Sequence, residues 1–307
     1  MALWIPITLA AAFLQNLRSA MQKHLQTSLG TTGATFVRFG YGFPFALAYA
    51  AALHFMFGFE LPRPGSAFVS YASIGGIAQI LGTACLLASF RQRNFAVGTA
   101  YSKTETVQAA LFGFVLLGDH IGAVAAAGIA ISLAGVLALS LAKAAAWRAG
   151  LVGFARALIG RAALLGLASG AFFGISAVCY RAASLSLDSP GGDPGFLMAA
   201  GYTLAWVSFL QTVLMIGYLR AREPGQLTAI WRARRQSIWV GLAGAAASIC
   251  WFTAFTLQSA AHVRAVGQVE LVFTFLASTL VFRERSNAAE IAGIVMMVAG
   301  ILVLLLL

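Results

Sequence analysis

Two stretches of sequence that match each other at key positions decide the fold. Residues 96–119 read AVGTAYSKTETVQAALFGFVLLGD, and residues 261–284 read AHVRAVGQVELVFTFLASTLVFRE. A shift of 165 residues places Glu105 on Glu270 and Asp119 on Glu284. The chain has only nine acidic residues, so two acidic matches in one register indicate an internal repeat.

The same shift extends outward from these stretches, because it also places Gly76 on Gly241 and Gly128 on Gly293. A bilayer core of about 30 Å requires about 20 apolar residues in a helix. Dividing the chain at clusters of charged residues, Pro and Gly predicts ten spans: 3–25, 32–58, 67–90, 95–117, 121–142, 162–185, 195–219, 237–257, 261–282 and 288–307.

Five spans in each half place the two halves in opposite orientations across the membrane. This is the inverted-topology repeat of many transporters. The predicted domains are a first repeat at 1–143, a basic connector at 144–161 and a second repeat at 162–307. We therefore expect an all-α integral membrane protein of ten transmembrane helices.

Composition points to the same class of protein. The 307 residues are 60% hydrophobic and 9% charged, whereas soluble domains have about 25% charged residues. The net charge of +11 comes from Lys and Arg gathered in short connectors, as the positive-inside rule predicts. We expect a multi-pass protein of a bacterial-type inner membrane, in contact with the lipid bilayer and with no nucleic-acid partner.

The two quoted stretches resemble the fourth and ninth helices of the EamA-like branch of the drug/metabolite transporter superfamily. The resemblance covers nearly the whole chain and implies ten helices in two homologous halves. Members of the family usually have Glu-Pro in the middle of these helices, where this chain has Glu105-Thr106 and Glu270-Leu271. Because proline kinks helices, its absence here predicts straighter helices.

Glu105 and Glu270 are the main candidates for a functional site. A carboxylate inside the membrane is costly and usually faces a cavity or a partner. The repeat predicts that the two flank a central cavity, where they bind a cationic group of a solute or exchange a proton. The alternative is a structural role, in which each carboxyl is protonated or bonded to neighbouring helices.

Lys103 lies about 200° around the helix from Glu105, so the two cannot pair on one face. Its partner is either Glu270 or the carboxylate of a substrate, and a cavity with both charges suits a zwitterion such as an amino acid. The alternative is that Lys103 extends toward one end of the membrane.

Uncharged and basic residues complete the predicted lining. Gln15 and Arg18 form a polar stripe with Gln22 on the first span. Interhelical hydrogen bonds explain the glutamines equally well, but not a buried arginine, which keeps its charge. The predicted substrate-binding or proton-coupling residues are Glu105, Glu270, Lys103, Arg18, Gln15, Gln79, Tyr101 and Gln268.

The sequence has no motif of an enzyme. The four histidines lack the spacing of a metal site, and no phosphate-binding loop or nucleophile elbow occurs. We expect no enzymatic activity, no cofactor and no metal, in a monomer or homodimer.

The predicted function is secondary transport of a small metabolite, an amino acid or related amine, by alternating access, with protons as a candidate coupling ion. Export or exchange is the expected mode, and the alternative is a flippase for a lipid-linked substrate.

The orientation of the chain has two conflicting predictions. Connectors after odd-numbered spans contain most of the Lys and Arg, which predicts that both termini lie outside the cytoplasm. The family resemblance implies cytoplasmic termini instead.

Overall fold

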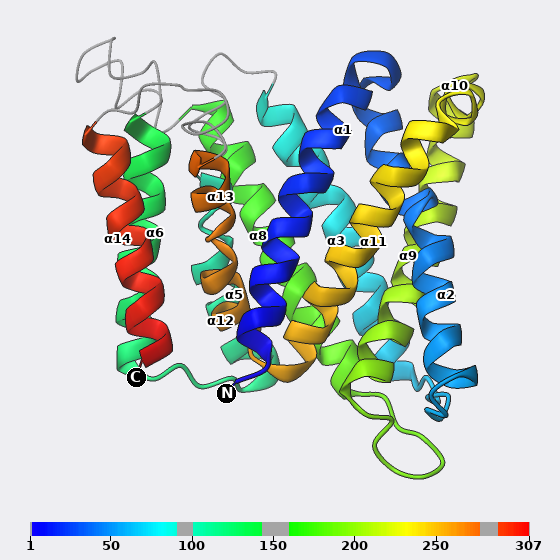
Figure 1. The fold of residues 1–307 in the computed structure, drawn as a ribbon, viewed down its shortest axis with the longest axis horizontal. Coiled ribbons are helices and arrows are strands. Elements are labelled where there is room, and N and C mark those ends of the chain that lie inside the picture. Colours follow the sequence, from blue (N-terminus) through cyan, green and yellow to red (C-terminus); the bar gives the residue numbers. More distant parts are fainter. Residues whose placement is uncertain (1, 91–100, 143–159, 277–287, 307) are drawn as a thin grey trace. The chain divides into compact units, whose positions relative to one another are not determined.

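The computed structural model describes residues 2–90, 101–142, 160–276 and 288–306. No β-strand occurs in these ranges, so the predicted all-α fold is confirmed for them. The helices, shown in Figure 1, are α1 (Trp4–Gly40), α2 (Gly42–Phe55), α3 (Ser66–Phe90), α5 (Glu105–Leu117), α6 (Ala123–Ala142), α8 (Arg161–Leu185), α9 (Phe196–Arg222), α10 (Gln226–Arg232), α11 (Arg234–Leu257), α12 (Ala260–Gly267), α13 (Glu270–Leu276) and α14 (Ala288–Leu306).

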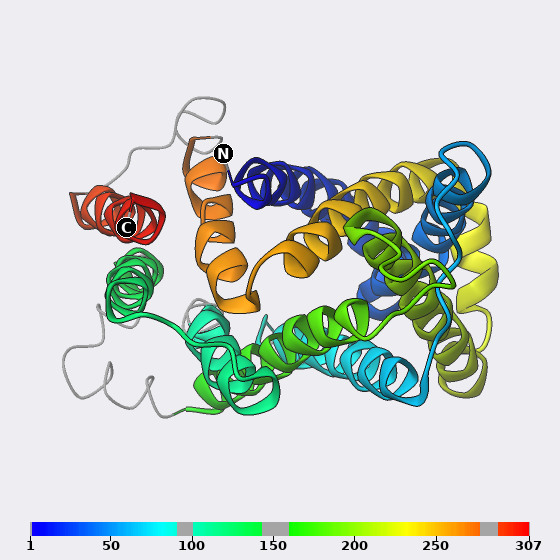
Figure 2. The ribbon, with the colours of Figure 1, turned by 90° about the horizontal axis from the view of Figure 1, so that it is seen from below.

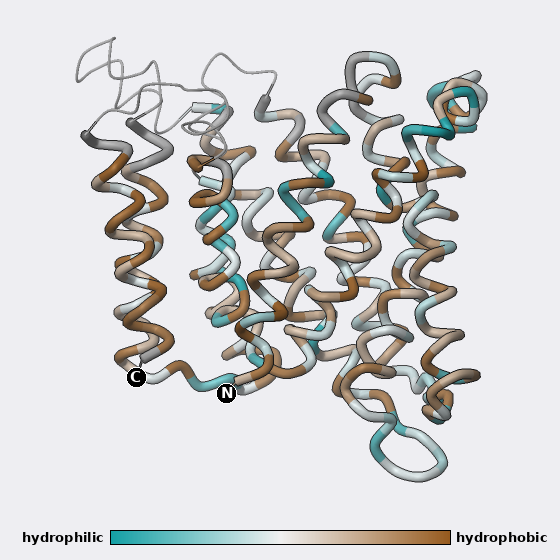
Figure 3. Tube along the Cα trace, in the orientation of Figure 1, coloured by the Kyte–Doolittle hydropathy of each residue, from teal (hydrophilic) through white to brown (hydrophobic). Residues whose placement is uncertain are grey.

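Five stretches of helix are long and apolar enough to cross a membrane: Thr32–Phe55, Ser66–Leu86, Ala163–Leu185, Phe196–Arg222 and Arg234–Leu257. Three shorter apolar helices accompany them, and Figure 3 shows how strongly hydrophobic residues dominate α6 and α14. The total of ten spans stays a prediction. Parts of the predicted fourth and ninth spans, most of the connector 144–161 and Glu284 lie outside the described residues.

The first two predicted spans are joined by a sharp turn at Gly30. Its φ of 64° and ψ of −175° are non-helical, and the chain reverses direction after it (Figure 1). The side-chain amide of Gln22 donates to the carbonyl of Ala34 at 2.7 Å. Twelve residues of straight helix would be about 18 Å long, so this bond requires the reversal. The helix therefore continues past residue 25, the predicted end of the first span, as far as the glycine.

The described chain forms two compact units, and each draws on both predicted halves of the sequence. Unit 1 comprises Met1–Ile77 and Cys179–Gln258, and unit 2 comprises Ala78–Val178 and Ser259–Leu307. The boundaries of the sequence repeats stay a prediction.

In unit 1, α1 packs along α11, and α2 packs against α9 and α11 (Figures 1 and 2). The rings of Tyr180 and Phe252 stack at the centre of its core, with centroids 4.5 Å apart. The core is mostly alanine, valine, leucine and these rings, which makes unit 1 a closely packed helical scaffold.

In unit 2, α6 and α14 form a closely packed pair that lies side by side in both views (Figures 1 and 2). The pair depends on glycines that face the opposite backbone. A Cβ atom on Gly128 would lie 2.8 Å from the carbonyl oxygen of Gly300 and 2.9 Å from the backbone nitrogen of Leu304. Without a hydrophobic driving force between helices in lipid, such backbone contact is a main source of their association.

Gly128→Ala is therefore expected to lower the stability of the folded protein by about 1–3 kcal/mol, because backbone atoms cannot move aside and the helices must separate. The measurement is thermal unfolding of the purified protein in detergent. Gly217→Ala on α9 is the matched control, because its new Cβ would meet nothing within 4 Å. This control should be neutral or stabilising by up to about 1 kcal/mol. Equal effects of the two substitutions would contradict the packing argument.

Candidate functional site: a charged cluster in unit 2

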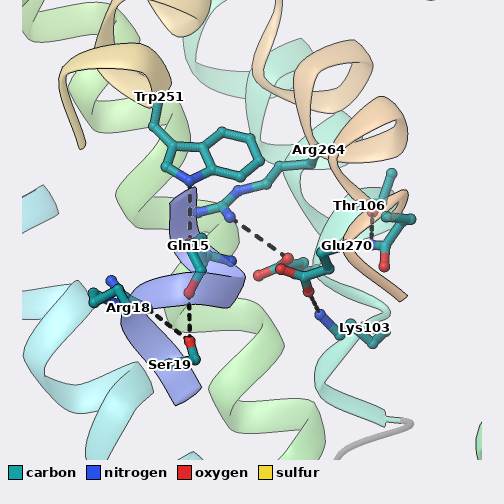
Figure 4. Close-up of polar contacts among 10 residues, drawn as sticks. Gln15, Arg18, Ser19, Lys103, Thr106, Trp251, Arg264 and Glu270 are labelled. Carbon is teal, nitrogen blue, oxygen red and sulfur yellow. Dashed lines mark hydrogen bonds and ion pairs between the residues drawn. The ribbon is translucent and has the colours of Figure 1, made fainter. Parts of the chain in front are cut away.

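Lys103 and Glu270 form a direct ion pair (Figure 4), in which the ammonium group of the lysine donates a hydrogen bond to Oε1 of the glutamate. Both side chains are largely buried. The sequence left two partners open for Lys103, namely Glu270 and the carboxylate of a substrate. The structure pairs Lys103 with Glu270. The pair joins residues 167 positions apart in the chain.

The second glutamate of the repeat faces a residue that the sequence analysis did not select. Nη1 of Arg264, on α12, lies 3.7 Å from Oε1 of Glu105, the first residue of α5. That distance is longer than a hydrogen bond, so these two atoms form an ion pair without a direct hydrogen bond. The available signal was the position of Arg264, a basic residue inside the predicted ninth span and six residues before Glu270.

The four charged side chains of Lys103, Glu105, Arg264 and Glu270 balance one another, with two positive and two negative charges. A neutral amide extends the cluster, because Gln268 donates from Nε2 to the hydroxyl of Thr106 at 3.0 Å. Gln268 is almost fully buried, and its Oε1 atom has no hydrogen-bond partner among the described residues. The cluster therefore has no net formal charge and includes a buried hydrogen-bond acceptor, Oε1 of Gln268.

The helices that carry these residues are interrupted at the site. Residues 103 and 104 form a turn before α5 begins at Glu105, and residues 268 and 269 separate α12 from α13, which begins at Glu270. Both interruptions are closed by tight turns, in which Thr104 N–H donates to the Tyr101 carbonyl and Val269 N–H to the Val266 carbonyl.

The prediction of straighter helices is wrong. Proline is one cause of a helix break, but polar side chains that compete for backbone groups are another. The hydroxyl of Thr104 donates to the carbonyl of Tyr101 at 2.6 Å, which stabilises the tight turn locally. Short segments with such i to i+3 bonds inside a helix often mark a hinge.

Glycines on α8 allow α5 to approach the helix closely at this point. A Cβ on Gly170 would lie 3.0 Å from the carbonyl oxygen of Ser102 and 3.2 Å from the backbone nitrogen of Glu105. A Cβ on Gly174 would lie 3.1 Å from the backbone nitrogen of Ala109. These glycines therefore position the backbone that carries Glu105.

Two of the predicted site residues, Gln15 and Arg18, belong to unit 1. The indole N–H of Trp251 donates to Oε1 of Gln15 at 3.1 Å (Figure 4). Arg18 is buried and its guanidinium donates to the hydroxyl of Ser19 at 3.5 Å. Its aliphatic stem lies against Gly244 of α11, 3.2 Å from the point where a Cβ would stand. The polar stripe of the first span therefore contacts α11.

The remaining predicted site residues are Gln79 and Tyr101. Gln79 is buried on α3, and its backbone carbonyl accepts a hydrogen bond from Thr83. Tyr101 is half-buried just before the turn at residues 103 and 104. Arg181 of α8, which is not in the predicted set, donates to the carbonyl of Phe255 on α11 at 2.8 Å, a contact between two helices.

A pair of opposite charges at 3.7 Å can accept a molecule that carries both charges. An ammonium group can replace the guanidinium beside Glu105, and a carboxylate can replace the glutamate beside Arg264, with two parallel hydrogen bonds from the arginine. Neither exchange leaves a net charge in the protein interior, which would be costly.

Comparison with solved structures supports the fold. One solved crystal structure is similar over 99% of this chain and 96% of its own chain, with a TM-score of 0.70 and 17% sequence identity. Among curated proteins, no sequence matches significantly.

The model of the EamA-like transporter family matches the chain in two segments, residues 2–141 and 160–306. These segments include nearly every residue, and they contain the helices that are long and apolar enough to cross a membrane. The chain therefore belongs to the EamA-like transporter family and is a multi-pass membrane protein that transports small solutes.

Proposed function

We propose that this protein is a secondary transporter of a zwitterionic metabolite, an amino acid or a related amine, in a bacterial-type inner membrane. The observation that carries the proposal is the neutral cluster of Lys103, Glu105, Arg264 and Glu270 on interrupted helices. A solute with one ammonium and one carboxylate group matches its charges, whereas a lipid-linked substrate has no evident counterpart there.

The two ion pairs have different roles in this proposal. Lys103 and Glu270 form a direct hydrogen-bonded pair that fixes the two helices to each other. Arg264 and Glu105 form the looser pair and bind the solute, the arginine its carboxylate and the glutamate its ammonium group. The interrupted backbone at both pairs provides the hinge that alternating access requires. Export or exchange is the mode that we propose, with protons as the candidate coupling ion.

The test is a solute screen by thermal shift on the purified protein, because a ligand that binds only the folded state raises its stability with the logarithm of ligand excess. Each amino acid that raises the unfolding temperature is followed by its methyl ester and its N-acetyl derivative. The ester lacks the carboxylate and the acetyl compound lacks the ammonium group. We expect both derivatives to lose most of the shift.

Glu105→Gln and Glu270→Gln accompany the screen, with Glu223→Gln as the matched control in the connector after α9. The amino-acid shift should disappear in Glu105→Gln and persist in the control. In Glu270→Gln we expect a lower starting stability and a smaller shift, because Lys103 is then free to compete for Glu105. A shift that is unchanged in both site variants, or one seen only with lipids, would refute the proposal and favour a flippase.

A further inference from the structure

The connector between α9 and α11 exposes a dense group of arginines beside two large aromatic rings. Trp231 is 65% exposed and Trp239 is 63% exposed. We call these residues together the arginine face; its arginines, all exposed, are Arg220, Arg222, Arg232 and Arg235. Only one acidic residue, Glu223, occurs between residues 220 and 239.

The arginine face lies at the boundary of the membrane. The helices before and after it, Phe196–Arg222 and Arg234–Leu257, are both long and apolar enough to span the bilayer, so the connector between them must lie at one surface. Figure 3 shows hydrophilic residues gathered at α10, at the end of these two apolar helices. Exposed tryptophans at this level are typical of side chains that sit among lipid headgroups.

Short-range contacts anchor this connector. Ile230 of α10 is almost fully buried, so the helix is anchored by its inner side. The guanidinium of Arg234 lies over the Trp231 ring, 5.4 Å from its centroid, and donates to the Trp231 carbonyl. A seven-residue helix is marginal in isolation, so these contacts are needed to present the arginines as a fixed surface.

The connector is also bonded to the turn between the first two spans. The side-chain amide of Gln226 donates to the carbonyl of Leu29, the residue before the reversal at Gly30. Carbonyls beside a helix break accept from side chains in this way, because the regular ladder does not continue past the break. The same amide lies so close to Gly33 that a larger residue there would displace it.

We propose that the arginine face binds the headgroups of anionic phospholipids and that this binding stabilises the turn at Gly30 through Gln226. Phosphate oxygens suit the arginines, because guanidinium groups donate paired hydrogen bonds to them. The exposed tryptophans of the same connector and the start of α11 favour a lipid surface over a soluble anion, since their rings partition to the level of the headgroups. Each arginine near an anionic membrane surface contributes about a fivefold gain in binding.

The experiment measures lipid binding to the purified full-length protein in detergent micelles. Dibrominated phosphatidylglycerol and dibrominated phosphatidylcholine are added in separate titrations, and binding is followed by quenching of tryptophan fluorescence. We expect the anionic lipid to quench at lower concentration and to raise the unfolding temperature, both less strongly at high salt, because salt screens exposed charges.

Arg235→Gln should weaken binding of the anionic lipid about fivefold. The triple variant Arg222→Gln/Arg232→Gln/Arg235→Gln should bind it no better than phosphatidylcholine. Arg63→Gln is the matched control, because Arg63 is an exposed arginine in the connector between α2 and α3, and this variant should bind as the parent does. Gln226→Ala should still bind the lipid but gain less thermal stability from it.

Three results would overturn the proposal. Equal quenching by the two lipids would show that the surface does not select for charge. Unchanged binding in the triple variant would place the lipid elsewhere. A full thermal gain in Gln226→Ala would separate the lipid from the turn. None of these outcomes depends on transport, so the solute proposal for unit 2 is tested independently.

Discussion

Lys103→Met is expected to destabilise the folded protein by about 3–5 kcal/mol, because it removes the ammonium group that pairs with the buried carboxylate of Glu270. The double variant Lys103→Met/Glu270→Leu is expected to recover most of that loss. Replacing both members of a buried pair by apolar side chains is often neutral, whereas removing one member is costly. In the native protein the two side chains are 16% and 14% exposed, so solvent screens them little.

The measurement is unfolding of the purified single and double variants in detergent, arranged as a double-mutant cycle. Arg161→Met is the control, because Arg161 is an exposed residue at the start of α8 and its loss should change stability by no more than about 0.5 kcal/mol. A double variant as unstable as the single would mean that the ion pair is not what couples Lys103 to Glu270.

Arg264→Gln is expected to weaken binding of a zwitterionic solute by about 30-fold or more. Truncating one member of a hydrogen-bonded charge pair in a buried site typically costs 2 kcal/mol or more. Arg264→Lys should lose less, because lysine keeps the charge but cannot form the paired hydrogen bonds that a guanidinium makes with a carboxylate. The measurement is the dissociation constant of the best solute of the thermal screen, by calorimetry.

The methyl ester of the same solute provides the sharpest control for Arg264. It lacks the carboxylate, so Arg264→Gln should change its affinity far less than that of the parent solute. If the acid and the ester lose affinity by the same factor, Arg264 does not contact the solute carboxylate. Glu105 would then remain as the binding residue of the pair, and the orientation proposed for the solute would be wrong.

The spans were predictable because crossing a bilayer depends on the local length and apolarity of the chain. The structure has α8 at Arg161–Leu185 and α11 at Arg234–Leu257, close to the predicted ranges 162–185 and 237–257. The family was also predictable, because its repeat is a property of the linear sequence. Breaks inside helices were not, since the length and apolarity of a span report neither the positive φ at Gly30 nor the turns at 103–104 and 268–269.

The sequence by itself showed that a shift of 165 residues aligns Glu105 with Glu270, and it singled out both as charges within apolar stretches. Only the tertiary structure decided their partners. Glu270 pairs with Lys103, whereas Glu105 faces Arg264, a residue that the sequence did not single out. Which side chains meet depends on how each helix is rotated and on where its backbone is interrupted. Both are set by packing between segments about 160 residues apart, such as the contact of α5 with α12, and not by either segment alone.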